Sequence, residues 1–144
     1  MIANIGIGYG NILFGMTQND VTKILGNPDK IITCRDDGIE WIYNSLKIKI
    51  FFGYEENERL YSIEVFHKEV EYLSHRIIGM SLNSFRQFME SKGYDSFEHE
   101  TYDYFETMYY DPLNTTFTVE FGEITSVEFS PLFEDDDTIR WPDE

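Results

Sequence analysis

A short sequence pattern occurs twice in this chain, 64 residues apart, and each time it introduces an amphipathic segment. FGMTQNDVTKIL spans residues 14–25, and IGMSLNSFRQFM spans residues 78–89. In each copy a Gly-Met pair precedes Thr or Ser, which are favoured helix N-caps. Apolar residues follow at helical spacing. The pattern therefore predicts two short helices that begin with the same signal.

The first copy carries a full set of helix start and stop signals. Asp20 lies three residues after the cap Thr17, where its carboxylate can accept from free backbone amides. Met16 and Val21 hold the positions of a hydrophobic staple. Gly-Asn-Pro at 26–28 predicts the end of the helix. The corresponding residues of the second copy are Ser81 as cap, Met80 and Phe85 as staple, and Gly93 as stop.

The similarity between the two halves continues beyond the predicted helices. LYSIEVF at 60–66 corresponds to ITSVEFS at 124–130, again with a shift of 64. Between them, IKIFFG at 48–53 corresponds to FTVEFG at 117–122. Three matches in the same order favour an internal duplication.

Alternating apolar and polar residues predict four strands after each helix. We therefore expect an α+β fold of two tandem α-β-β-β-β repeats that form an antiparallel sheet, with the helices on one face and the other face free. The length favours a single domain, 1–144. The predicted strands are 29–35, 38–44, 46–52, 59–66, 96–102, 104–110, 115–121 and 124–130; the predicted units are repeat 1 at 1–66, a linker at 67–77, repeat 2 at 78–133 and an acidic tail at 134–144.

Residue parity assigns the two faces of the expected sheet. One set is apolar and should face the helices: Ile48, Ile50, Phe52, Tyr61, Ile63, Val65, Phe117, Val119, Phe121, Thr125, Val127 and Phe129. The opposite set is mixed: Lys47, Lys49, Phe51, Ser62, Glu64, Phe66, Thr116, Thr118, Glu120, Ser126 and Glu128. The mixed face has no obligatory core residues and is available for binding.

The charge of the chain restricts the kind of partner. The net charge is −16, which argues against binding to nucleic acid or to an anionic membrane. Residues 1–76 have 8 Lys/Arg and 11 Asp/Glu, whereas residues 77–144 have 3 and 16, so the second part carries −13. A basic protein partner would explain this asymmetry, and a solvated acidic surface is the simpler alternative.

The cellular location is predicted from what the sequence lacks. Cys34 is the single cysteine, so no disulfide can form within the chain. The N-terminal segment MIANIGIGYG has no basic start and is interrupted by glycines, which is unlike a signal peptide. We therefore expect a cytoplasmic protein.

The order of the predicted helices and strands resembles that of two protein families. Gly-Met-Thr followed by a hydrophobic pair and Gly-Asn-Pro resembles the SmpA/OmlA-type domain of outer-membrane assembly lipoproteins. Two such units in tandem resemble the β-lactamase inhibitory protein (BLIP) fold. The resemblance implies a sheet of up to eight strands whose concave face binds a protein.

The acidity and small size also resemble bacterial immunity proteins, as in contact-dependent growth inhibition. The resemblance implies an immunity protein that binds and neutralises a toxin domain, including a nuclease, by steric and electrostatic occlusion. One alternative is an envelope-assembly or scaffold domain of SmpA/OmlA type. A second alternative is a small ligand-binding protein or enzyme that uses the concave face of the sheet.

The predicted contact residues are tyrosines and carboxylates of the second repeat and the tail. Tyrosine offers rigid contact area with a polar tip, and carboxylates steer a basic partner. An ordinary solvated hairpin explains the tyrosines and carboxylates of residues 95–111 equally well. The partner-binding residues are Glu98, Glu100, Tyr102, Asp103, Tyr104, Glu106, Tyr109, Tyr110, Glu120, Glu128, Asp135 and Asp136.

No pattern in the sequence predicts a cofactor, a metal site or a catalytic group. His67, His75 and His99 are scattered and have no metal-ligand spacing with Cys34. The acidic run 134–137 lacks the spacing of a calcium loop. We therefore expect a non-enzymatic binding protein.

The alternation of residues along the strands does not decide whether Trp41 and Trp141 belong to the core or to an interface.

Overall fold

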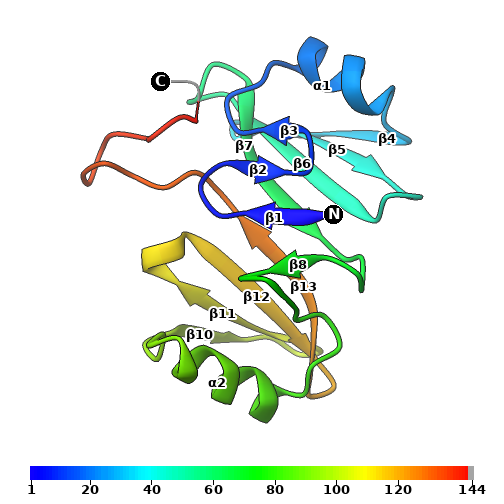
Figure 1. The fold of residues 1–144 in the computed structure, drawn as a ribbon. Helices are drawn as coiled ribbons and strands as arrows, with labels where there is room; N and C mark the ends of the chain where they lie inside the picture. The colour runs from blue at the N-terminus through cyan, green and yellow to red at the C-terminus, as the bar shows by residue number, and fades with distance from the viewer. Residues whose placement is uncertain (143–144) are drawn as a thin grey trace.

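The computed structural model describes residues 1–142 and shows an α+β fold with two helices and two sheets (Figure 1). This confirms the predicted α+β class, but not the predicted arrangement as two tandem repeats. The helices are α1 (Gln18–Leu25) and α2 (Leu82–Ser91), with a 3₁₀ turn at Asp111–Leu113. Neither helix of the described chain is long and apolar enough to cross a membrane.

The large sheet has eight strands in the order β10-β11-β12-β13-β7-β6-β5-β4, and every neighbouring pair is antiparallel. All eight predicted strands are present, each within two residues of its predicted ends. The halves of the sheet meet where β13 pairs with β7. The strands are β4 (Lys30–Cys34), β5 (Gly38–Tyr43), β6 (Ile48–Gly53), β7 (Arg59–Val65), β10 (Glu98–Thr101), β11 (Glu106–Tyr110), β12 (Thr115–Glu120) and β13 (Glu123–Phe129).

A small second sheet was not predicted. Its order is β3-β2-β1-β8-β9, and β1 pairs in parallel with β8 through Ile2 opposite Glu71. The segment 67–77 supplies β8 and β9 and buries Val70, Tyr72 and Ile77. Strands of two or three residues are too short to show alternation. They are β1 (Ile2–Asn4), β2 (Gly8–Tyr9), β3 (Ile12–Leu13), β8 (Glu71–Tyr72) and β9 (His75–Arg76).

The repeated Gly-Met pair joins each helix start to the large sheet. The Gly15 amide donates to Leu60 O over 2.8 Å, and the Leu60 amide donates back to Met16 O over 2.7 Å. Gly15 has φ +96° and Gly79 has φ +98°, in the left-handed region that favours glycine. In the second half the Gly79 amide donates to Ile124 O (2.8 Å) and the Ile124 amide to Met80 O (2.9 Å).

Both predicted N-caps are confirmed. Thr17 Oγ1 accepts from the Asp20 amide at 3.2 Å, and the Asp20 carboxylate accepts from the Thr17 amide at 3.1 Å, which completes a capping box. Ser81 Oγ accepts from the Ser84 amide at 3.1 Å. Among the apolar residues that follow the first cap at helical spacing, Val21 is buried, but Ile24 is 42% exposed.

One face of the large sheet is covered, and the core lies beneath the cover. In Figure 1 both helices and the small sheet lie in front of the large sheet. The ring of Phe117 in β12 packs against the Phe85 ring of α2 and the Tyr72 ring of β8. The distances between ring centroids are 4.7 Å and 5.4 Å. Trp41 is buried against Phe52 in the same core.

The C-terminal segment folds back on the first half. Trp141 is buried, and the Arg59 guanidinium lies over its ring at 4.1 Å. Arg59 also donates from Nε to Gly15 O at 2.9 Å. The predicted acidic tail 134–144 therefore includes a core contact. Its last two residues, 143 and 144, lie outside the described residues.

Two β-bulges change the predicted assignment of faces. In β7, Leu60 pairs with Phe52 and Ser62 with Phe51, so Tyr61 is the extra residue. In β13, Thr125 is the extra residue in the same way. The bulges place Leu60 and Ile124 in the core. The prediction that Tyr61 faces the helices is wrong, because Tyr61 lines a hollow on the opposite face beside Glu64, and Thr125 lies outside the ladder of β12 and β13. Phe121 was also predicted to face the helices, but it lies in a turn and is 95% exposed.

Candidate functional site

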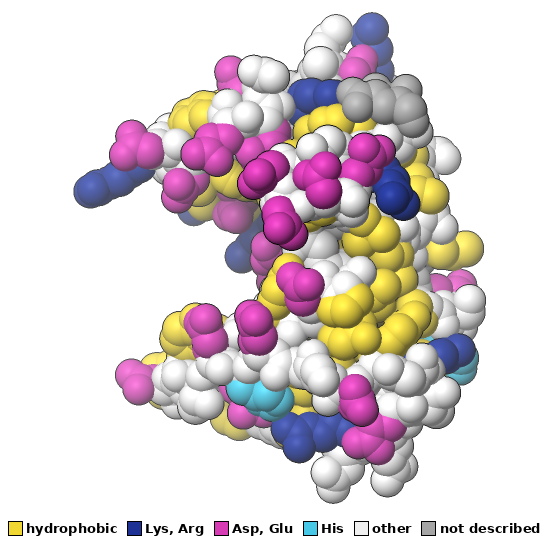
Figure 2. Space-filling model, turned by 90° about the vertical axis from the view of Figure 1, so that its left-hand side faces the viewer, with side chains coloured by type: hydrophobic (Ala, Val, Ile, Leu, Met, Phe, Trp, Pro, Cys, Tyr) yellow, Lys and Arg dark blue, Asp and Glu magenta, His cyan; other side chains and the backbone are white. Residues whose placement is uncertain are grey.

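The uncovered face of the large sheet is concave and forms a cleft. Figure 2 shows the molecule deeply hollowed on its left side, with Asp and Glu side chains along both walls of the hollow. The covered face lies on the right in that view, because the front of Figure 1 has been turned to the right. The cleft therefore opens on the mixed face that the sequence left free of core residues.

A row of side chains crosses the floor of the cleft from one edge of the sheet to the other. Cross-strand pairing places its members opposite one another in succession. Two glutamates occupy the middle of the row, at the junction of β7 and β13. The row runs Lys30, Ile42, Lys49, Glu64, Glu128, Thr116, Tyr109 and Glu98.

The two central glutamates are held by two serines in a reciprocal arrangement. Glu64 lies opposite Glu128. Ser126 Oγ donates to Glu64 Oε2 at 2.9 Å, and Ser62 Oγ donates to Glu128 Oε1 at 3.2 Å. Each serine belongs to the strand of the other glutamate, so the four side chains form one group, the glutamate–serine group.

Burial raises the pKa of both carboxyl groups. For Glu64 the nearby charge of Glu128 adds to the increase, while the Ser126 hydroxyl and the Lys49 ammonium act in the opposite direction. For Glu128 the charge of Glu40 adds to the increase in pKa, and Ser62 and Lys49 oppose it. Glu128 is accessible to solvent, but protein surrounds it on several sides at the cleft floor. The concave shape of the cleft explains why Glu128 is accessible to solvent and yet surrounded by enough protein to raise its pKa.

A hollow of about 390 Å³ is lined by Glu64, Glu128 and Ser62 of the glutamate–serine group. Lys49 is the only cation among the residues that line it, against the carboxylates of Asp37, Glu40, Glu64 and Glu128. Apolar and aromatic contact area comes from Phe51 and Tyr61, and Cys34 and Ser130 complete the wall. Cys34 is half-buried here, at the wall of the hollow.

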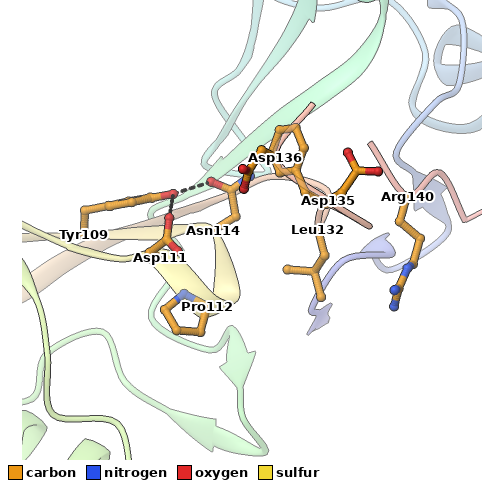
Figure 3. A pocket seen from close by; sticks show the side chains of 9 residues that line it. Tyr109, Asp111, Pro112, Asn114, Leu132, Asp135, Asp136 and Arg140 are labelled. Carbon is orange, nitrogen blue, oxygen red and sulfur yellow. Dashed lines mark hydrogen bonds between the residues drawn. The ribbon is translucent and has the colours of Figure 1, made fainter. Parts of the chain in front are cut away.

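A second hollow of about 390 Å³ lies beside the 3₁₀ turn (Figure 3). The Tyr109 hydroxyl donates to Asn114 Oδ1 at 3.0 Å, and Asp111 Oδ1 lies 3.5 Å from the same hydroxyl. Asn114 Nδ2 donates to Pro131 O at 2.8 Å. Burial raises the pKa of Tyr61, which lines the central hollow, and the nearby Asn114 side chain opposes this increase. Asn114 therefore lies between the two hollows.

The structure separates the predicted contact residues into four groups. The tyrosine–carboxylate hairpin is therefore not one surface. Cross-strand parity and the linings of the hollows place Glu98, Glu100, Tyr109, Glu120 and Glu128 on the cleft face, Tyr102, Asp103 and Tyr104 at the end of the β10–β11 hairpin, Glu106 and Tyr110 on the covered side, and Asp135 and Asp136 at the second hollow. Tyr110 is only 6% exposed and packs against Tyr94 and Phe97.

The set of predicted contact residues left out most of the cleft floor, including Glu64, Ser62, Ser126 and Lys49. The sequence contained a signal for three of them. Glu64 and Ser62 correspond to Glu128 and Ser126 by the same shift of 64 that relates the two helix starts. Among residues 1–142 no group of three or more His, Cys, Asp and Glu side chains is arranged to hold a metal ion.

Comparison with known proteins gives similarity in fold only. No family profile matches the sequence, and no curated protein matches it. An extracellular protein containing an SCP domain from Bacillus anthracis matches with a TM-score of 0.55 and 9% identity, over 91% of this chain and 48% of that chain. A cysteine-rich secretory protein from Staphylococcus aureus matches with a TM-score of 0.50 and 12% identity, over 82% and 43%. The chain thus spans about half the length of these solved structures.

These neighbours correct three predictions. They are SCP-domain and cysteine-rich secretory proteins, so the predicted resemblance to BLIP-like and SmpA/OmlA-type proteins is wrong. The predicted resemblance to toxin immunity proteins is wrong for the same reason. The predicted cytoplasmic location is contradicted as well, because both neighbours are extracellular or secretory proteins.

Proposed function

We propose that this chain is a protein-binding domain that holds a positively charged segment of its partner in the cleft. The glutamate–serine group is the observation that supports this most directly. Two carboxylates, Glu64 and Glu128, lie opposite each other on the cleft floor. A lysine or arginine side chain between them would relieve their repulsion and form charge-assisted hydrogen bonds.

The distribution of charge supports the same partner. The sequence has no Lys or Arg between Lys92 and Arg140, a stretch that includes four strands of the large sheet. An acidic concave surface concentrates field lines and accelerates the approach of a basic protein. The same field repels phosphate groups, which makes a nucleic acid an unsuitable ligand for the cleft.

Aromatic side chains on the cleft floor provide contact area beside the charges. Phe51 and Tyr61 line the central hollow, and Tyr109 lies in the row that contains Glu128. Large rigid side chains of this kind supply much of the binding energy at protein interfaces. We therefore propose that the charges recognise the partner and that the aromatic side chains of the cleft floor keep it bound.

We also propose that the two halves arose by duplication. Three features occur in both halves with a shift of 64. They are the hydrogen bonds from the Gly-Met pairs to Leu60 and Ile124, the bulges at Tyr61 and Thr125, and the two glutamates. Duplication of one unit followed by joining at β7 and β13 would bring equivalent glutamates together at the seam. The two carboxylates of the site would then derive from one ancestral residue.

Calorimetric titration with a hexa-arginine peptide tests the proposed function. The probe has the charge of the proposed ligand and no structure of its own. We expect saturable binding that weakens between roughly 50 and 150 mM salt, as for any contact between exposed charges. In the double variant Glu64→Gln/Glu128→Gln, the affinity should fall by about tenfold, which corresponds to about 1.4 kcal/mol.

A matched variant separates the cleft from net charge. Glu69→Gln/Glu90→Gln removes the same two charges from a turn and from α2, away from the row across the cleft floor. Its affinity should stay within about twofold of the parent, because screening weakens distant charges. Equal losses in the two double variants would mean that the peptide responds to net charge alone. An unchanged affinity in the cleft variant would exclude the glutamate–serine group from binding.

A further inference from the structure

Four aromatic side chains are exposed together at one end of the large sheet. Tyr104 and Phe121 are 83% and 95% exposed, and Tyr102 and Phe105 are 47% and 39% exposed. They come from two hairpins, β10–β11 and β12–β13, and they line one shallow hollow of about 270 Å³. We call these four residues the aromatic tip. Large apolar side chains gathered on a surface are typical of binding sites.

The conformation of Phe121 is unfavourable for a phenylalanine. Glu120 pairs with Glu123, so Phe121 and Gly122 form a two-residue hairpin loop. Their φ angles are +51° and +77°. Both values are positive, as in a type I′ turn, which favours Asn-Gly because asparagine adopts this conformation more easily than bulky residues. The fold therefore does not require phenylalanine here.

The neighbouring hairpin holds its aromatic residues in place. The Tyr102 amide donates to Phe105 O at 2.8 Å, which closes a turn around Asp103 and Tyr104. The rings of Tyr102 and Phe105 stack at 4.6 Å between centroids, with 18° between their planes. The Tyr102 hydroxyl donates to the Glu100 carboxylate. Side chains ordered in this way lose little entropy when a partner covers them.

Carboxylates border the aromatic tip and indicate what can cover it. Glu120 and Glu123 flank the Phe121 turn, Glu100 binds the Tyr102 hydroxyl, and Asp103 lies within the other turn. Lys92 and Arg140 are the nearest cations along the chain on either side. We propose that the aromatic tip docks into an apolar depression on a protein partner that is bordered by lysine or arginine side chains.

The same charges make two other occupants unfavourable. A second copy of this chain would bring another net charge of −16 against the tip. A membrane with anionic lipids would repel the bordering carboxylates. This surface is separate from the glutamate–serine group, so its variants leave the cleft unchanged and the two proposals can fail independently.

The test uses the full chain and a synthetic amphipathic helix of leucine and lysine, in which lysines border an apolar stripe. The variant Phe121→Asn should bind this peptide about tenfold more weakly, as expected for the loss of one buried aromatic contact. Its Tm should rise by about 2 °C, because asparagine suits the turn better than phenylalanine. Stability and binding should thus change in opposite directions.

The control is Ile31→Thr, which removes a 58% exposed apolar side chain from the edge strand β4. It should bind the peptide as tightly as the parent. Equal affinity of Phe121→Asn and the parent would overturn the proposal. Binding to phosphatidylcholine vesicles that is lost in Phe121→Asn would indicate a membrane instead. Self-association of the parent in sedimentation velocity that is lost in the variant would indicate a second copy.

Discussion

Replacing one glutamate of the glutamate–serine group should make the protein more stable at neutral pH. Glutamine at position 64 keeps an oxygen that can accept the Ser126 hydrogen bond, but it removes the charge opposite Glu128. The folded state raises the pKa of both carboxyl groups above the ordinary value of 4.5, so it binds their protons more tightly than the unfolded state. Ionisation of these groups therefore opposes folding.

The size of the effect follows from the pairing geometry. Side chains directly opposite on antiparallel strands start about 5 Å apart, and two unit charges at about 6 Å repel by roughly 3 kcal/mol at an effective dielectric constant of about 20. Glu128 is accessible to water, so screening reduces this to about 1 kcal/mol. Glu64→Gln and Glu128→Gln should each raise the Tm by about 4 °C at neutral pH.

Urea denaturation at a series of pH values measures the effect. The gain in the free energy of unfolding should be absent below the ordinary pKa of 4.5, where the parent carboxyl groups are protonated in both states. It should grow as the pH rises through the elevated folded-state pKa values and then level off. In the double variant the gain should be less than the sum of the single gains, because both substitutions remove the same repulsion.

Glu123→Gln is the matched control for this reasoning. Glu123 also lies opposite a glutamate, Glu120, but it does so at the exposed end of the β12–β13 hairpin. Water screens that pair, so the control should change the free energy of unfolding by less than about 0.5 kcal/mol. The reasoning is refuted if Glu64→Gln destabilises the protein at neutral pH, or if its gain is the same at every pH.

Four further predictions concern stability and are measured by urea denaturation at neutral pH. Thr17→Ala removes the cap of α1 and should reduce the free energy of unfolding by about 1 kcal/mol, with Thr17→Ser close to the parent. Gly79→Ala should reduce it by about 1–2 kcal/mol through its φ of +98° alone, because an added Cβ meets nothing within 4 Å. Gly15→Ala should reduce it further, because its Cβ would lie 2.6 Å from Arg59 Nη2 and 3.2 Å from Cε3 of the buried Trp141 ring; equal losses at the two glycines would contradict this. Tyr72→Phe should reduce it by about 1 kcal/mol by removing the 2.7 Å hydrogen bond to Thr115, and an unchanged stability would show that this bond contributes nothing.

The elements that the sequence predicts correctly depend on local signals. Both helices follow from an N-cap within three residues of its partner amide, and each begins where its cap predicts. The eight strands follow from alternation over four to seven residues. The covered face is correct wherever the alternation is uninterrupted, as in β6 and β12.

The features that the sequence does not predict depend on contacts between distant segments. The bulges exclude Tyr61 and Thr125 from the ladder because Leu60 and Ile124 exchange hydrogen bonds with the Gly-Met pairs. No pattern within one strand reveals a bond to a segment about 45 residues away. The same limit applies to the cleft, because the seam between β7 and β13 brings Glu64 to Glu128.

The parallel pairing of β1 with β8 affects how the protein is made. Strand β1 begins at the second residue of the chain, and its partner lies 69 residues later. At roughly 5–20 residues per second, a ribosome needs several seconds to synthesise that partner. During this interval β1 lacks one of its two neighbours, so the small sheet stays incomplete. The first half therefore cannot finish folding before the connecting segment 67–77, which supplies β8, has been synthesised.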